Sequence, residues 1–258
     1  FEAFRTALDE AQSDDEKLES YISFSFTEFR NKPDSLFKIA QEVENLQPAS
    51  VSKKEAYRNF ILAFAWRQSN SDSSRFYAKQ ASEQLKDLNS HLNYLRSLNL
   101  LGTEYARYGN TLNAEATFIQ ALDYQSEHSV DDYPEHFFYG NLGNIYSRVG
   151  AYDLAIKMYS RVLENIEQTS DRCNIQATLA SNLAKVDDFN RAVETLTPCI
   201  NEESLIPPIA SIVHSNMSLI LIDSAAVSSG LKYLEKATAI RYDNRVPNME
   251  IAHQVRLG

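Results

Sequence analysis

The chain contains two cysteines and five histidines, and the spacing of these residues decides which chemistry they can do. Cys173 and Cys199 do not form a Cys-x-x-Cys pattern. The histidines have no spacing typical of metal ligands; they are His91, His128, His136, His214 and His253. The sequence also lacks His-Glu-x-x-His, Gly-x-Ser-x-Gly and P-loop patterns. We therefore predict that this fragment is not an enzyme and has no catalytic residue, no metal site and no cofactor.

Bulk composition narrows the class of partner. The 258 residues are 43% apolar and carry a net charge of −10, which disfavours nucleic acid or an anionic membrane as the main partner. The longest apolar run, Phe60 to Trp66, is too short for a hydrocarbon core of about 30 Å, so we expect no membrane insertion by this fragment. Because the chain begins at Phe1 rather than Met, we expect it to be an excised piece of a longer protein.

A helix-turn-helix pattern organises the middle of the chain. In 136–167, HFFYGNLGNIYSRVGAYDLAIKMYSRVLENIE, apolar and small residues recur at helical intervals on both sides of a turn at Gly150. The residues that carry this pattern are Leu142, Gly143, Tyr146, Ala155, Tyr159 and Val162. The same spacing occurs 41 positions earlier, at Leu101, Gly102, Tyr105, Gly109, Ala114, Phe118 and Ala121. Further copies begin near Cys173 and near Ser211.

This pattern resembles the tetratricopeptide repeat over roughly residues 52–240. The resemblance implies an all-α fold, a right-handed α-α superhelix of about five to six helical hairpins, whose inner surface is lined mainly by the first helix of each repeat. Small residues should permit close approach within each hairpin. The expected pairs are Gly102 with Ala114, Gly143 with Ala155, Ala180 with Ala192, and Ser218 with Gly230.

The repeat register also divides the chain. The expected segments are a degenerate hairpin at 1–50, a divergent hairpin at 51–90, repeats at 91–131, 132–170, 171–206 and 207–242, and a truncated C-terminal helix at 243–258. The interval of 41 exceeds the family unit of about 34 residues, which two additional helical turns would explain, most simply one on each helix or in the link 127–133.

In the family's register, Cys173 and Cys199 occupy positions that face each other across one hairpin. The resemblance therefore implies that they are neighbours, and a disulfide would indicate an oxidising compartment. The alternative is that both are small buried residues, since one of these positions commonly takes Ala in the family and free cysteines are often buried.

A row of basic residues falls at one position of three successive repeats, near polar residues of the expected inner face. These groove candidates are Asn99, Thr103, Arg107, Asn144, Arg148, Ser181 and Lys185. They could receive a carboxylate or an extended peptide backbone. The alternative is that the basic residues belong to the ordinary repeat pattern and are solvated at helix ends.

Three functions are compatible with this reading. The first is a protein- or peptide-binding scaffold, whose organisation resembles the extracytoplasmic, periplasmic sensor region of bacterial membrane signalling proteins with a diguanylate cyclase or histidine kinase output. The second is a cytoplasmic peptide-binding regulator. The third is a structural adaptor or homodimerisation segment, in which the ends Phe1 to Leu46 or Met249 to Leu257 self-associate. Ligand identity, any output domain and the source organism do not follow from the sequence.

Overall fold

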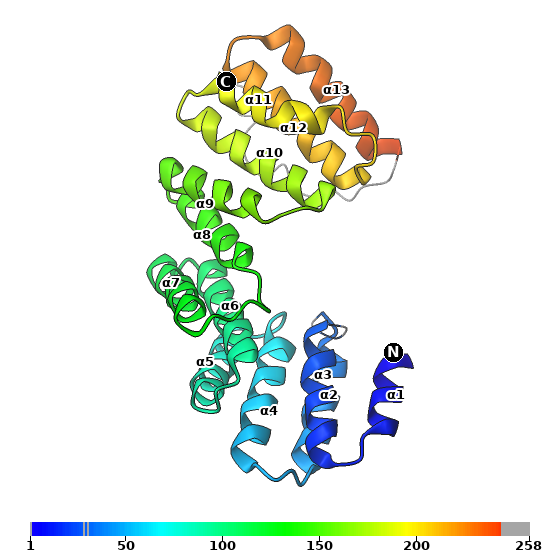
Figure 1. Ribbon diagram of the computed structural model, residues 1–258. Helices are drawn as coiled ribbons and strands as arrows, with labels where there is room; N and C mark the ends of the chain where they lie inside the picture. The colour runs from blue at the N-terminus through cyan, green and yellow to red at the C-terminus, as the bar shows by residue number, and fades with distance from the viewer. Residues whose placement is uncertain (1, 28, 30, 244–258) are drawn as a thin grey trace. The chain divides into compact units, whose positions relative to one another are not determined.

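The computed structural model describes residues 2–27, 29 and 31–243, and every regular element within them is an α-helix. The prediction of an all-α chain is therefore confirmed for this part of the sequence (Figure 1). Of the truncated helix expected at 243–258, residues 244–258 lie outside the described residues.

The chain divides into two compact units, residues 1–138 and 139–258. The helices of the first unit are α1 Glu2–Glu10, α2 Asp14–Thr27, α3 Pro33–Asn45, α4 Val51–Trp66, α5 Ser71–Asp87, α6 His91–Arg107 and α7 Thr111–His128. Helix α8, His136–Arg148, begins in the first unit and ends in the second. The second unit continues with α9 Tyr152–Glu164, α10 Thr169–Lys185, α11 Phe189–Ile200, α12 Pro207–Asp223 and α13 Val227–Asp243.

The twelve described helices that follow α1 form six consecutive pairs, α2 with α3 through α12 with α13. Helices α6 and α7 have 17 and 18 residues, whereas α8 and α9 have 13 each. The longer repeat therefore gains about one turn on each helix, as the interval of 41 residues suggested.

Four of the pairs are joined by three-residue loops whose middle residue has a left-handed backbone. These residues are Gly109, Gly150, Asp187 and Ala225, with φ of 76°, 80°, 61° and 66°. A positive φ reverses the chain within one loop and satisfies helix-end carbonyls, because the amide of the third residue after the helix bonds back into its last turn. In the α6–α7 loop, for example, Asn110 N donates to Tyr105 O at 2.9 Å.

Tight packing within the pairs depends on small residues, although not always on the neighbours that we expected. A Cβ added at Gly102 would lie 2.6 Å from the Phe118 ring, and one at Gly143 would lie 2.8 Å from the Tyr159 ring. The groups nearest to these glycines are thus aromatic rings, not Ala114 and Ala155, because each ring reaches across from one turn further along the second helix. At Gly230 the expected neighbour is present, since the Ser218 carbonyl oxygen would lie at 2.9 Å.

The first helices of consecutive pairs pack closer together than the second helices. Helix α4 contacts α6 and α10 contacts α12, while α5 with α7 and α11 with α13 make no comparable contact within the described residues. In a two-layer stack the layer with the closer spacing is the inner one. The inner face of the first unit therefore belongs to α4 and α6, with α2 also against α4. In the second unit it belongs to α10 and α12.

Capping residues fix where the early helices begin. Ser13 Oγ accepts from Glu16 N at 3.2 Å, and the Glu16 carboxylate accepts from Gln12 N at 2.7 Å, so the Ser-x-x-Glu segment Ser13–Glu16 starts α2. Helix α4 begins at Val51, one residue before a second Ser-x-x-Glu segment at Ser52–Glu55, because Ser50 Oγ accepts from Lys53 N at 3.2 Å and caps the helix.

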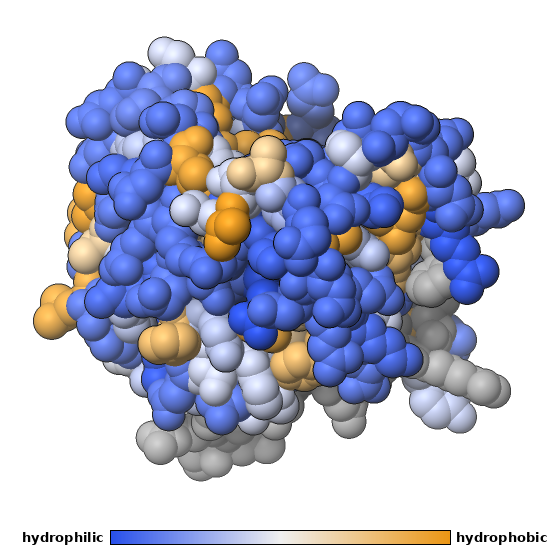
Figure 2. All heavy atoms as spheres, turned by 90° about the horizontal axis from the view of Figure 1, so that it is seen from below, coloured by the Kyte–Doolittle hydropathy of each residue, from blue (hydrophilic) through white to orange (hydrophobic). Residues whose placement is uncertain are grey.

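The face drawn in Figure 2 is mainly hydrophilic, with apolar residues in small separate groups. Some large apolar side chains are nevertheless well exposed on the described helices and loops, among them Phe76, Leu112 and Phe137. Scattered exposure of this kind is ordinary for a soluble surface, so individual sites must be argued from their polar groups as well.

Candidate functional site

The inner face of α6 presents a stripe of polar side chains at helical spacing. Asn99, Thr103 and Arg107 were predicted there, and Arg96 lies one turn earlier on the same stripe. Sequence reasoning missed Arg96, although its spacing of three from Asn99 was a usable signal.

Arg96 is a partly buried cation that forms no ion pair with the described residues. Its Nη1 donates to Asn93 Oδ1 at 3.1 Å, and its guanidinium lies 4.3 Å from the ring centroid of Phe26 on α2. Its Nε is buried and has no hydrogen-bond partner in the part of the chain that the structure describes. Burial lowers the pKa of Arg96, an effect that the nearby Tyr133 opposes, yet an arginine remains charged. No carboxylate pairs with Arg96 within the described residues, so its unmet charge and donor favour an anionic ligand.

Besides Phe26, a second aromatic residue, Tyr133, lies near this cation. Tyr133 is buried, and its ring centroid lies 5.5 Å from that of Phe137, whose side chain is 46% exposed. We call Phe26, Asn93, Arg96, Tyr133 and Phe137 the Arg96 cluster. It combines a desolvated guanidinium with exposed aromatic surface, which is the composition of many protein-binding hot spots.

The predicted groove residue Arg107 is occupied within the chain. Its Nη1 donates to Arg67 O at 2.8 Å and lies 3.5 Å from Glu104 Oε1. Glu104 is fully buried and also pairs with Arg67 Nε at 3.3 Å, while Ser71 Oγ donates to its other oxygen at 3.3 Å. This network joins the ends of α4 and α6 and the start of α5. The Arg107 guanidinium is thus engaged in contacts within the first unit.

The other predicted groove residues are distributed over both units. Thr103 Oγ1 donates to Asn99 O at 2.7 Å within α6, and Asn144 Oδ1 accepts from Tyr159 Oη at 2.7 Å, which ties α8 to α9. Ser181 is partly buried on α10. Arg148 and Lys185 are exposed at the ends of α8 and α10. Because Arg107 lies in the first unit and the other two basic residues in the second, the structure does not test a continuous ladder.

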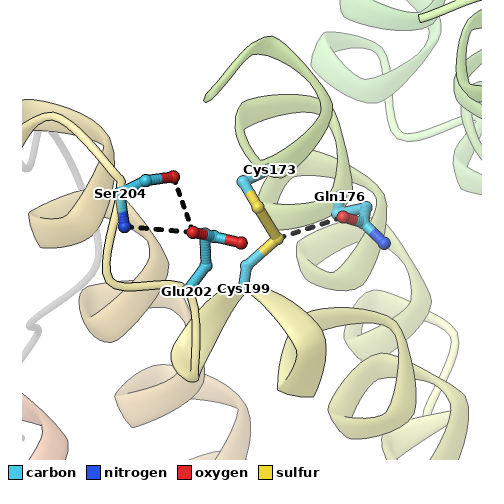
Figure 3. The surroundings of a disulfide bond; sticks show 5 residues. All are labelled: Cys173, Gln176, Cys199, Glu202 and Ser204. Carbon is cyan, nitrogen blue, oxygen red and sulfur yellow. Dashed lines mark hydrogen bonds between the residues drawn. A yellow bond between two sulfur atoms is a disulfide. The ribbon is translucent and has the colours of Figure 1, made fainter. Parts of the chain in front are cut away.

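Cys173 and Cys199 are joined by a disulfide that links α10 to α11 (Figure 3). Their Cα atoms are 5.6 Å apart, within the range of about 4.4 to 6.8 Å that a disulfide needs. Both side chains are buried, and Cys199 Sγ lies 3.0 Å from Gln176 Oε1. In the loop after α11, Ser204 N and Oγ donate to Glu202 Oε1 at 3.0 and 2.6 Å, which lowers the pKa of Glu202.

Other kinds of site find no support in the described part of the chain. No group of three or more His, Cys, Asp or Glu side chains there could hold a metal ion. Within the same residues, no helix combines the length and apolar character needed to span a bilayer.

Comparison with known proteins supports the fold. The model of the tetratricopeptide repeat family matches residues 138–169. No curated protein matches the sequence. Similar solved structures include BtubC (BKLC) from P. vanneervenii, with 14% identity over 93% of this chain and 98% of that one and a TM-score of 0.65.

Two further structures share the architecture. A Podosopora anserina putative kinesin light chain with nearly identical TPR-like repeats has 16% identity over 78% of this chain and 100% of that one, with a TM-score of 0.63. MamA from Desulfovibrio magneticus RS-1, residues 41 to the end, has 12% identity over 83% of this chain and 97% of that one, with a TM-score of 0.55. At these identities the likeness shows the fold alone: a tetratricopeptide-like helical repeat.

Proposed function

We propose that this chain is a non-catalytic scaffold whose first unit binds a protein or peptide segment on its inner face. The observation that carries the proposal is Arg96, a partly buried guanidinium with an unpaired Nε and no carboxylate partner in the described residues. Relatives in fold, such as a putative kinesin light chain, are built from the same kind of repeat.

The Arg96 cluster also indicates what the bound segment should carry. A carboxylate can accept hydrogen bonds from the planar guanidinium, and such charge-assisted bonds are among the stronger polar contacts. The exposed ring of Phe137 offers an apolar contact in the same cluster. We therefore expect a segment with an acidic side chain, or a C-terminal carboxylate, close to an apolar residue.

The test is selection from a displayed library of random peptides, followed by fluorescence polarisation with synthetic copies of the enriched sequences. We expect enriched peptides to pair a carboxylate with an apolar residue. Arg96→Gln should weaken their binding at least about tenfold, since a hydrogen bond to a charged group is worth roughly 1.5 to 3 kcal/mol.

A matched control is Arg161→Gln. Arg161 lies on α9, the second helix of its pair, is exposed, and among the described residues forms an ion pair only with Glu164, at 3.2 Å. This change should leave binding unaltered. Failure to enrich any peptide, or binding that survives Arg96→Gln together with Phe26→Ala, would refute the inner face of the first unit as the binding surface.

For the cellular role, we propose the sensing region of a bacterial membrane signalling protein, on the periplasmic side. The support is the pairing of Cys173 with Cys199, because disulfides persist mainly in oxidising compartments. A cytoplasmic peptide-binding regulator and a structural or homodimeric adaptor are the competing roles. Thiol trapping at lysis of the source cells separates them: two thiols blocked only after reduction support export, whereas two thiols blocked at once favour the cytoplasm.

A further inference from the structure

The outer side of the first unit contains a pocket of about 480 Å³ that the inner-face proposal does not use. It forms because α5 and α7 are second helices of consecutive pairs and are not in close contact, so the space between them opens onto α6. The pocket is lined by Ala116 and Ile119 of α7 and by Tyr94 of α6, among others. A concave site with apolar walls and a few polar groups is a typical small-molecule site.

Two tyrosines give the pocket an aromatic floor with an unused donor. The rings of Tyr94 and Tyr124 pack edge to face with centroids 4.5 Å apart. Tyr124 Oη lies 2.7 Å from His91 Nδ1, and Gln120 Nε2 donates to Tyr94 Oη at 2.8 Å. Tyr94 is only 2% exposed, and its own hydroxyl hydrogen has no acceptor within the described residues. A buried donor of this kind calls for an acceptor from a ligand or water.

Charges of both signs line the same pocket. Lys86 lies in the last turn of α5, while Asp123 and Glu127 lie one turn apart on α7. None of these three side chains takes part in an ion pair or hydrogen bond in the described part of the structure. Gln120 Oε1 is also left as an acceptor, because only its amide nitrogen is used by Tyr94.

We infer that this pocket binds a small zwitterion of the α-amino-acid class with an apolar or aromatic side chain. The ammonium group is held by Asp123 and Glu127, the carboxylate by Lys86 and the Tyr94 hydroxyl, and the side chain packs on the tyrosine floor. The site lies on the opposite layer from the Arg96 cluster and is independent of the proposed peptide binding.

The test compares three probes that share one apolar body. L-Phenylalanine carries both charges, phenethylamine lacks the carboxylate, and 3-phenylpropionate lacks the ammonium. Calorimetry and saturation-transfer NMR on the full chain should show L-phenylalanine binding with a Kd of about 1 mM or tighter, and each singly charged probe at least about tenfold weaker. No binding of L-phenylalanine, or equal binding of phenethylamine, would overturn the assignment.

Variants locate the site. Asp123→Asn with Glu127→Gln, and separately Lys86→Met, should each weaken L-phenylalanine binding at least about tenfold, because each removes one charged contact. The matched control Glu194→Gln, at an exposed acid on α11, should leave binding unchanged. Arg96→Gln should also leave it unchanged, so that loss of the inner-face function and loss of this pocket are distinguishable. Binding that persists in both pocket variants would refute the site.

Discussion

The carboxylate of Glu104 is fully buried on α6 and lies 3.3 Å from Arg67 Nε at the end of α4. The two partners are not equivalent, because the Arg67 side chain is 27% exposed and can reach water, whereas Glu104 cannot. Removal of Arg67 leaves the Glu104 carboxylate buried with Arg107 as its remaining cationic partner among the described residues. We therefore expect Arg67→Met to destabilise the first unit by about 3 kcal/mol, and Arg67→Met with Glu104→Met to cost less.

The measurement is urea unfolding combined with amide hydrogen exchange in α4 and α6. The comparison is the exposed pair Arg161 and Glu164, whose side chains are 55% and 57% exposed. Breaking that pair by Arg161→Met should cost less than about 1 kcal/mol. A double variant less stable than Arg67→Met alone would contradict the asymmetry.

Gly102 and Gly140 should respond to alanine in opposite directions. A Cβ at Gly102 would lie 2.6 Å from Phe118 Cε1, while at Gly140 the nearest atom, Val162 Cγ2, is 3.9 Å away. Gly102→Ala should cost roughly 1 to 3 kcal/mol through overpacking, less the gain in helix propensity of about 1 kcal/mol. Gly140→Ala should stabilise by up to about 1 kcal/mol. Thermal unfolding distinguishes them, and Phe118→Leu should rescue Gly102→Ala. Equal effects at the two glycines would exclude the proposed contact.

Ala225 occupies the loop position that two other hairpins fill with glycine. Its φ is 66°, against 76° at Gly109. A left-handed backbone costs a non-glycine residue roughly 1 to 2 kcal/mol, offset in part by the greater entropy of an unfolded glycine. Ala225→Gly should therefore stabilise the second unit by about 0.5 to 1 kcal/mol, and Gly109→Ala should destabilise the first. Chemical denaturation measures the free energy of unfolding of both variants against the unaltered chain. A destabilised Ala225→Gly would show that this loop is not strained.

The helical repeat could be predicted because it is written in short-range periodicity. Leu101, Gly102 and Tyr105 recur 41 residues later as Leu142, Gly143 and Tyr146, and both sets lie on first helices of pairs. The partner of each glycine was harder to predict, because the reach of an aromatic side chain, not sequence spacing, decides what fills the gap. Hence the ring of Phe118, and not the methyl group of Ala114, lies nearest to Gly102.

The candidate sites were less predictable than the helices. Arg107 fits the repeat pattern, yet its guanidinium is used by Arg67 and Glu104, which a residue count cannot anticipate. The guanidinium of Arg96 lies over the ring of Phe26, 70 residues earlier in the chain, and sequence spacing does not reveal this contact. Contacts of this kind depend on the N-terminal helices, where the repeat pattern is degenerate.

The disulfide should contribute measurable stability to the second unit. It closes a loop with a sequence separation of 26, which corresponds to about 3 kcal/mol on the loop-entropy model. Unfolding with and without reductant should differ by this amount in the unaltered chain. The variant Cys173→Ala with Cys199→Ala should be indifferent to reductant. An unaltered chain that shows no response to reductant, with two alkylatable thiols, would favour the alternative of two buried cysteines.

His214 should make the second unit sensitive to mild acid. Burial lowers its pKa, and the nearby Lys236 on α13 lowers it further. Its ring stacks on Tyr233, and its Nδ1 has no hydrogen-bond partner among the described residues. The unfolded chain, with a pKa of about 6.5, then binds a proton more readily than the folded chain. The stability from neutral His214 is present above that value and is lost as the pH falls below it. Unfolding at pH near 7.5 and near 5.5 should therefore show a larger loss for the unaltered chain than for His214→Gln. Equal losses would mean that His214 titrates alike in both states.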